Sequence, residues 1–389
     1  MSVTAKQTVM HISDCYLPRL GGIEVQVAEL ARIQATAGHM VHVVTATPAH
    51  TPDLEEGDAP RLHRIVAPLP FELPVHPRAG RALAHLLAVV APDVVHVHVG
   101  AVSPFAWTAV SQAVRAGLPT VVSVHSMWDP LTSGIYRVLD VAKWRTWPIV
   151  TAAVSTAAAR PLQDVLGIRA EVRVIPNGFD PAAWPAAPSA SPTDRPMHVV
   201  AVGRLAPRKQ PFTLLHMLRS ANAASVLSCR IRATIAGDGP AEAWMRRYLA
   251  RYSMTEWVQL TGRVDRHQLP SLLATADVFL APARREAFGL AALEARCVGI
   301  PVIARADTGV ADFIVNERDG LLGHRGAGLT AALIRLLTDT ELRCRIATHN
   351  RATPPVRFAW PQVKRQLDQC YADAQSLSGT TQTLPRRAC

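Results

Sequence analysis

Short runs rich in β-branched residues alternate with longer segments of helical periodicity along the first 175 residues of this 389-residue chain. Four of these runs indicate buried strands: Thr8–Ser13, Met40–Thr45, Val94–Val99 and Thr120–Val124. Between the first two, five positions recur at helical spacing: Ile23, Val27, Leu30, Ala31 and Gln34. Such alternation of strand and helix predicts an α/β fold with a parallel, doubly wound sheet.

The pattern stops near Ile175 and restarts near His198. Six prolines fall between Pro176 and Pro196, with alanine and serine among them, and this composition is typical of a linker. Five more strand-like runs follow: His198–Val202, Arg232–Ala236, Val258–Leu260, Val278–Ala281 and Pro301–Ala304. We expect a domain over residues 1–180, a linker over 181–197 and a second domain over 198–357. A helix over 358–375 and a polar, disordered tail over 376–389 end the chain.

Hydrophobic residues make up 49% of the chain and charged residues 18%, which excludes intrinsic disorder. The net charge of +11 indicates an anionic partner: nucleic acid, a membrane surface or a phosphorylated small molecule. Residues 1–180 hold 14 basic and 14 acidic side chains, whereas residues 181–389 hold 27 and 16. The excess therefore lies in the second half. Because the arginines are scattered and form no basic stripe with stacking aromatics, we do not expect nucleic acid as the partner.

Six scattered cysteines without a Cys-x-x-Cys spacing fit neither a disulfide framework nor a zinc site, so a reducing compartment is expected. The first residues lack the apolar core of a signal peptide, and apolar stretches such as residues 82–90 are too short to span a membrane. We expect a cytoplasmic protein, with contact to the inner face of the membrane as an open alternative.

The densest group of candidate residues lies at 284–301, where a strand ends and a helix begins. Glu286 lies in the loop, Gly289 near the helix start and Glu294 more than a turn into the helix. The glycine allows a ligand to approach the backbone, and the free N–H groups of a helix start favour phosphate. A carboxylate such as Glu294 can accept hydrogen bonds from sugar hydroxyls. An amphipathic helix with two surface glutamates is the alternative interpretation.

Two further loops suit an anion. Gly203 and the cations Arg204 and Lys209 directly follow a strand, where open α/β sheets bind ligands. Near the N-terminus, Gly21 and Gly22 join the first strand to the first helix and leave backbone N–H groups for an anion or a sugar. A solvated loop and an ordinary tight turn are the plainer explanations.

Together, these three clusters resemble the retaining glycosyltransferases of family 4, which have the GT-B fold: two Rossmann-like domains facing each other across a cleft. The family's Glu-x7-Glu motif corresponds to Glu286 and Glu294, and its Gly-Arg…Lys motif to Gly203, Arg204 and Lys209. Other landmarks match over most of the chain: Gly237-Asp238-Gly239-Pro240, Leu260-Thr261-Gly262-Arg263-Val264, Gly309-Val310 and Asp319-Gly320-Leu321-Leu322. The final helix resembles the one that completes the first domain in that family. Gln210 is a departure, because the family usually has glycine after the lysine.

The resemblance implies a retaining, metal-independent transferase without a tightly bound cofactor. Its donor would be a nucleotide diphosphate sugar, GDP- or UDP-linked, with mannose or glucose as candidate sugars. Arg204 and Lys209 would neutralise the departing diphosphate, Glu286 would contact the sugar and Glu294 the ribose. The remaining donor contacts would come from Gly21, Gly22, Gly262, Arg263 and the backbone of Phe288, Gly289 and Leu290.

His125 follows the strand Thr120–Val124 at the place where the family has an active-site histidine. The resemblance therefore gives it a contact with the donor sugar. A strand-end histidine held only by structural hydrogen bonds is the alternative. His96 and His98 lie on another strand, and we interpret both as structural.

The acceptor is expected to bind the first domain. An aromatic and basic stretch follows His125, comprising Trp128, Tyr136, Lys143, Trp144, Arg145 and Trp147. Such a mixture suits a membrane interface, so a glycolipid or another amphiphilic acceptor is one hypothesis. Buried tryptophans beside solvated arginines are the other.

Two other function classes stay open on the sequence. One is a sugar-nucleotide epimerase with the same fold, which would convert the donor without an acceptor. The other is a non-catalytic nucleotide-binding protein. A panel of nucleotide sugars separates the three classes. Release of nucleoside diphosphate supports transfer, an altered sugar supports epimerisation, and binding without turnover supports a non-catalytic protein.

Overall fold

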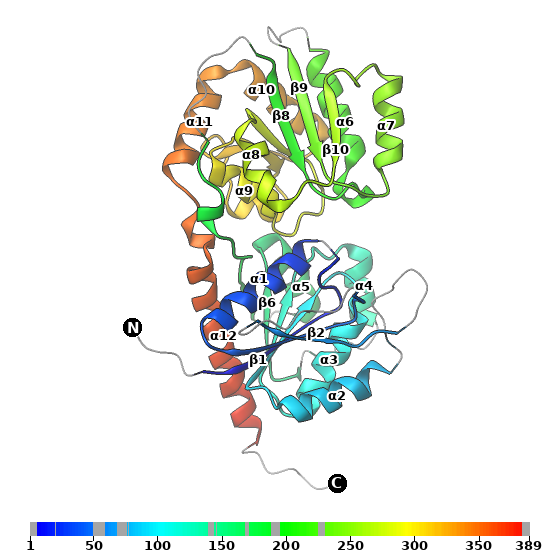
Figure 1. The fold of residues 1–389 in the computed structure, drawn as a ribbon, viewed down its shortest axis with the longest axis vertical. Helices are drawn as coiled ribbons and strands as arrows, with labels where there is room; N and C mark the ends of the chain where they lie inside the picture. The colour runs from blue at the N-terminus through cyan, green and yellow to red at the C-terminus, as the bar shows by residue number, and fades with distance from the viewer. Residues whose placement is uncertain are drawn as a thin grey trace. The chain divides into compact units, whose positions relative to one another are not determined.

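The computed structural model describes residues 6–19, 21–49, 59–67, 76, 78–138, 144, 146–167, 171–187, 195–224 and 230–382. The chain divides into two compact units (Figure 1). Unit 1 comprises residues 1–178 and 360–389, and unit 2 comprises residues 179–359. Each described sheet is parallel and carries helices, so the α/β, doubly wound architecture expected from the sequence is confirmed.

Unit 1 contains a sheet of seven strands in the order β3-β2-β1-β4-β5-β6-β7. Its strands are β1 (Thr8–Ser13), β2 (Met40–Thr45), β3 (Arg61–Arg64), β4 (Val94–Val99), β5 (Thr120–Val124), β6 (Ile149–Ala153) and β7 (Val172–Val174). Its helices are α1 (Gly22–Thr36), α2 (Ala79–Val90), α3 (Pro104–Arg115), α4 (Pro130–Val138), α5 (Thr156–Leu166) and α12 (Trp360–Gln382). The order of strands reverses between β1 and β4, and open α/β sheets bind ligands at such a point.

Unit 2 repeats this plan with the strand order β10-β9-β8-β11-β12-β13. Its strands are β8 (Met197–Val202), β9 (Ile231–Ala236), β10 (Val258–Gly262), β11 (Val278–Ala281), β12 (Val302–Arg305) and β13 (Gly320–Gly323). Its helices are α6 (Pro211–Asn222), α7 (Glu242–Arg251), α8 (Leu269–Ala274), α9 (Leu290–Val298), α10 (Gly326–Thr338) and α11 (Thr340–Ala352). Here the order reverses between β8 and β11.

The last helix, α12 (red in Figure 1), packs on the sheet of unit 1. Val363, Leu367 and Tyr371 recur at helical spacing along it and enter a buried cluster with Val94 of β4 and Val121 of β5. The core of unit 1 is thus built from both ends of the chain.

Two stretches differ from their sequence interpretation. The helix α12 continues to Gln382, so the expected disorder is wrong for residues 376–382; residues 383–389 lie outside the described part. Residues 179–187, expected partly as linker, pack into unit 2: Trp184 is buried, and the Ala187 N–H donates to the Val298 carbonyl over 2.7 Å. Burial of large apolar side chains such as Trp184 outweighs the proline-rich composition there.

Candidate active site

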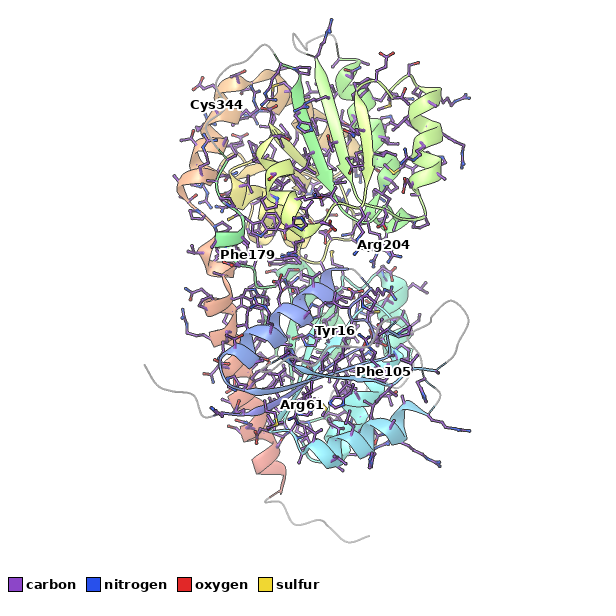
Figure 2. All side chains as sticks on the ribbon, in the orientation of Figure 1. Tyr16, Arg61, Phe105, Phe179, Arg204 and Cys344 are labelled. Carbon is purple, nitrogen blue, oxygen red and sulfur yellow. The ribbon has the colours of Figure 1, made fainter. Side chains whose placement is uncertain are left out.

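The candidate residues of unit 2 follow strands that border the reversal of strand order. Arg204 and Lys209 come directly after β8, and Glu286 follows β11. Because the carboxyl ends of parallel strands meet at one edge of a sheet, these loops share an edge. Arg204 is exposed there and is labelled in Figure 2.

Lys209 and Glu286 form an ion pair between the Lys209 Nζ and the Glu286 Oε2 atoms. The pair links two loops that are 77 positions apart in the chain. The Lys209 and Glu286 side chains are 29% and 21% exposed. A ligand at this edge therefore meets a charged pair that is partly shielded from water, where electrostatic interactions are stronger than at a fully exposed site.

The loop that carries Glu286 is held by backbone contacts. The Gly309 N–H donates to the Glu286 carbonyl over 2.9 Å. Gly289, the residue before α9, has φ +95°, and a β-carbon added to it would lie 2.6 Å from a methyl carbon of Val310. Only glycine fits this conformation and this contact without strain. The pair Gly309-Val310, noted in the sequence, thus holds the Glu286 loop in place through a hydrogen bond and a close packing contact.

Glu294 lies in the second turn of α9 and is buried. Its Oε1 atom lies 3.4 Å from the Nη2 atom of Arg266. The guanidinium of Arg266 also lies 5.8 Å from the ring centre of Trp184. Arg266 is a residue that the sequence pattern does not predict, because nothing near it in the chain marks it as the partner of a carboxylate 28 positions later.

The loops after β9 and β10 come close to the β8 loop. Gly237 has φ +139°, its N–H donates to the Gly262 carbonyl over 2.7 Å, and a β-carbon there would overlap the Gly203 carbonyl. Arg263 is exposed. The structure thus brings Gly203, Gly237 and Gly262 together as a backbone-lined edge, next to the exposed cations Arg204 and Arg263.

In unit 1, the N-terminus of α1 already faces a carboxylate of the chain. Glu24 is buried and pairs with Arg19 over 3.4 Å. Its side-chain oxygens occupy the space that a β-carbon on Gly21 would fill, whereas no atom of the described residues lies within 4 Å of such an atom on Gly22. The N–H groups expected to bind an anion at Gly21 and Gly22 are therefore next to an internal negative charge.

His125 follows β5 and joins a group of buried histidines. Its Nε2 atom lies 3.0 Å from the Nδ1 atom of His98, and its own Nδ1 atom is buried. Burial lowers the pKa of His125 to about 4, and the nearby Asn177 side chain, which does not meet the geometry of a hydrogen bond to Nδ1, opposes the shift. The ring is therefore neutral at physiological pH.

Asp14, in the loop after β1, is a titratable residue that the sequence analysis missed. Its Oδ1 atom accepts a hydrogen bond from the Phe105 N–H over 3.1 Å, and its buried Oδ2 atom has no hydrogen-bond partner in the described part of the chain. Burial raises the pKa of Asp14 to about 7, although hydrogen bonds from Ser103 and Phe105 oppose the shift. Phe105 is labelled in Figure 2.

The aromatic stretch expected at a membrane interface is mostly buried. The rings of Trp128 and Tyr136 are stacked with centres 4.1 Å apart, and both residues, with Trp144, are buried. This removes them as interface residues, because they pack against one another. Lys143 and Arg145 lie outside the described residues. Among the described helices, none is long and apolar enough to cross a membrane.

Of the predicted site residues, those in unit 2 gather at one edge of its sheet: Gly203, Arg204, Lys209, Gly262, Arg263, Glu286, Phe288, Gly289, Leu290 and Glu294. The ring of Phe288 packs against Phe313 and Phe358 in the interior, which leaves only its backbone for a ligand. Gly21, Gly22 and His125 belong to unit 1.

Two family models match the chain in sequence. Residues 20–183 match the model described as Glycosyltransferase Family 4, and residues 187–353 match Glycosyl transferases group 1. Between them, the matches span most of both units.

Among curated proteins, the chain is 29% identical over 308 residues to a glycogen synthase of Mycobacterium tuberculosis, which covers 76% of this chain and 72% of the relative. It is 28% identical over 410 residues to a D-inositol 3-phosphate glycosyltransferase of Stackebrandtia nassauensis, covering 94% and 90%. Among solved structures, Anabaena HepE in complex with UDP and glucose shares the fold with a TM-score of 0.73 at 17% identity, covering 94% and 99%.

Proposed function

Since this chain belongs to the group 1 glycosyltransferases, which have the GT-B fold, we propose that it moves a hexosyl group with retention of configuration and without a metal ion. It is a glycosyltransferase that uses a nucleotide sugar as donor. The proposed donor is a UDP- or GDP-linked hexose, glucose or mannose. The proposed acceptor is a hydroxyl group of a sugar, a cyclitol phosphate or a glycolipid precursor.

One observation carries the proposal: the ion pair between Lys209 and Glu286 beside the reversal of strand order in unit 2. In the proposed complex, Lys209 meets the diphosphate and Glu286 meets the sugar hydroxyls, so the two ends of one donor contact neighbouring side chains. The start of α9 adds backbone N–H groups with a favourable dipole for the departing phosphate.

The proposed reaction needs no nucleophile from the protein. The bond between the anomeric carbon and the β-phosphate oxygen breaks as the acceptor oxygen bonds to the same face of that carbon. The acceptor's proton passes to the departing phosphate oxygen. Lys209, Arg204 and the N-terminus of α9 stabilise the negative charge that develops there.

The relatives guide the choice of donor and acceptor. HepE was solved with UDP and glucose, which favours testing UDP-glucose first. The glycogen synthase and the D-inositol 3-phosphate glycosyltransferase suggest acceptors rich in hydroxyl groups. A lipid anchor on the acceptor is not supported by the aromatic stretch, because its described rings are mostly buried.

A panel of UDP- and GDP-hexoses, each with and without candidate acceptors, tests the proposal. We expect release of nucleoside diphosphate from at least one donor and an α-linked product from an α-linked donor by NMR, with the rate unchanged by EDTA. An altered sugar still attached to its nucleotide would instead indicate epimerisation. Binding without turnover of any donor would indicate a non-catalytic protein.

The variants Lys209→Ala and Glu286→Ala test the assigned site. Each should lower turnover by about 100-fold or more, because each removes charge stabilisation and leaves its partner unpaired. Lys364→Ala is the matched control, since Lys364 also pairs with a carboxylate, Asp368 of α12, over 2.9 Å. Turnover close to wild type in Lys209→Ala or Glu286→Ala would remove that residue from the proposed site.

A further inference from the structure

Seven buried or partly buried side chains of unit 1 form one continuous path of hydrogen bonds. It starts at Ser123 on β5 and returns to His125, two residues later. The path runs through Ser123, His96, Tyr371, Gln34, His11, His98 and His125, with donor–acceptor distances between 2.6 and 3.0 Å. The members come from β1, β4, β5, the loop after β5, α1 and α12.

The strands bring the histidines together. His11 of β1 is directly opposite His96 of β4, and His98 lies two residues along the same strand, so their side chains share one face of the sheet. On that face, Gln34 of α1 and Tyr371 of α12 complete the path. The sequence interpretation of His96 and His98 as structural residues did not anticipate a connection to His125.

All four rings are neutral at physiological pH. Burial lowers the pKa of His11 and of His125 to about 4, and lowers the pKa of His96 and of His98 well below the ordinary value. A neutral imidazole has one N–H group and one lone pair. Each ring that bonds on both sides must therefore donate on one side and accept on the other, so the direction of donation is the same along the path.

The orientation of the Gln34 amide sets that direction in the structure. Its amide nitrogen donates to the Tyr371 hydroxyl over 3.0 Å, which leaves its carbonyl oxygen to accept from His11 Nε2 over 2.6 Å. His98 Nε2 must then donate to His11 Nδ1, and His125 Nε2 must donate to His98 Nδ1. His125 is left with a lone pair on Nδ1, a buried atom without a hydrogen-bond partner in the described part of the chain.

His125 borders a small cavity. A cavity of about 30 Å³ is lined by His98, His125, Asn177 and Trp360, among other residues of unit 1. A cavity of this size holds about one water molecule or one hydroxyl group.

We propose that Gln34 and Tyr371 are positioning residues that hold His125 as its Nε2–H tautomer, so that Nδ1 accepts a hydrogen bond from a hydroxyl group. If the Gln34 amide rotated by half a turn, donation along the whole path would reverse, and Nδ1 would carry a proton instead. The contact to a substrate hydroxyl rests on the proposed function, but the tautomer of the free protein does not.

His11, His96 and His98 also place possible metal-ligand atoms within 4.8 Å of one another. All six of their ring nitrogens already take part in the hydrogen bonds of the path. A metal ion would have to break these hydrogen bonds. The hydrogen-bonded path, called the relay below, is therefore the better explanation of why these histidines lie together.

Nitrogen-15 NMR of the histidine rings in the full-length protein, without donor, tests the relay. Wild type should show His125 as nearly all Nε2–H tautomer. Tyr371→Phe removes the acceptor of the Gln34 amide N–H, so either orientation of the amide then leaves one of its groups unpaired. The Nε2–H fraction should fall to about half, as for two states of similar energy. Gln34→Leu removes the amide that sets the direction of donation, so it should give a similar mixture of the two His125 tautomers.

Tyr136→Phe is the matched control, because Tyr136 is another buried tyrosine of unit 1 whose hydroxyl accepts a hydrogen bond, here from Trp107 over 2.9 Å, outside the path. In Tyr136→Phe, the fraction of His125 in the Nε2–H tautomer should equal that of wild type. An unchanged tautomer in both Tyr371→Phe and Gln34→Leu, an equal change in Tyr136→Phe, or stoichiometric zinc in the purified protein would overturn the relay. If the tautomers are as expected but wild type turns over no donor, only the proposed function is contradicted.

Discussion

At the scale of single residues, sequence reasoning selected candidate residues but did not predict which of them pair. Glu286, Lys209 and His125 stand out because each follows a strand of a parallel sheet. Their partners could not be predicted. The Lys209–Glu286 pair spans 77 positions, and Tyr371, in the path that reaches His125, lies 337 positions from Gln34. Contacts of this kind depend on the packing of helices on the sheet, which local sequence patterns do not encode.

Gln210 provides a prediction at this scale. It replaces the glycine usual in the family and has φ +61°, in the left-handed region that costs ordinary residues about 1 kcal/mol. Gln210→Gly should therefore leave the free energy of unfolding unchanged or raise it by up to about 1 kcal/mol, since loss of the 3.1 Å bond from Thr213 offsets part of the gain.

Urea denaturation measures this difference. The control is Gln112→Gly within α3, where glycine should lower the free energy of unfolding by about 1 kcal/mol. Equal destabilisation in the two variants would show that the backbone conformation of Gln210 carries no strain.

At the scale of elements, the sequence predicted the strands well, but it predicted the extent of the linker and of the last helix less well. The buried runs Thr8–Ser13, Met40–Thr45, Val94–Val99 and Thr120–Val124 are strands with the expected limits. Their β-branched composition leaves little alternative. The proline-rich segment and the last helix were misjudged, because Trp184 and the apolar face of α12 gain stability from tertiary burial that a local composition does not reveal.

The loop before α9 gives a prediction for an element. Gly289→Ala should lower the free energy of unfolding by roughly 1–3 kcal/mol, because alanine is strained at φ +95° and its β-carbon would collide with Val310. It should also weaken binding of UDP, since the Glu286 loop would shift.

Gly134→Ala in α4 is the control, because within the described part of the chain no atom lies within 4 Å of a β-carbon there. Its free energy of unfolding should be unchanged or slightly higher. Urea denaturation and calorimetric titration with UDP give the two quantities, and wild-type values for Gly289→Ala in both would refute the role assigned to this glycine.

At the scale of the whole molecule, the division of charge has a structural counterpart. The sequence has its excess of basic residues in positions 181–389. The exposed cations Arg204 and Arg263 lie at the same sheet edge of unit 2 as Lys209. Unit 1 instead contains a buried group of neutral histidines. The number of histidines in the sequence does not indicate that these residues are hydrogen-bonded to one another.

Because of these histidines, we expect the stability of the folded protein to fall in acid. His11, His96, His98 and His125 stay neutral in the folded protein below pH 6.5, whereas the unfolded chain binds protons there. Stability should therefore fall as the pH drops from about 6.5 toward 4, by on the order of a few kcal/mol per pH unit. Asp14 acts in the opposite direction, since its raised folded pKa of about 7 removes stability as the pH rises from about 4 to 7.

Urea denaturation at pH 7 and pH 5.5 measures the net effect. In Asp14→Asn the opposing group is gone, so the loss of stability on acidification should be larger than in wild type. Equal stability at the two pH values, in both proteins, would contradict the neutral, buried state of the histidines.

The central claim is that the Lys209–Glu286 pair acts on a nucleotide sugar donor. The most direct measurement is the rate of nucleoside diphosphate release from the preferred donor by wild type, Lys209→Ala, Glu286→Ala and the control Lys364→Ala. The account predicts a loss of about 100-fold or more in the first two variants and none in the control. Release at the wild-type rate by both site variants would contradict it.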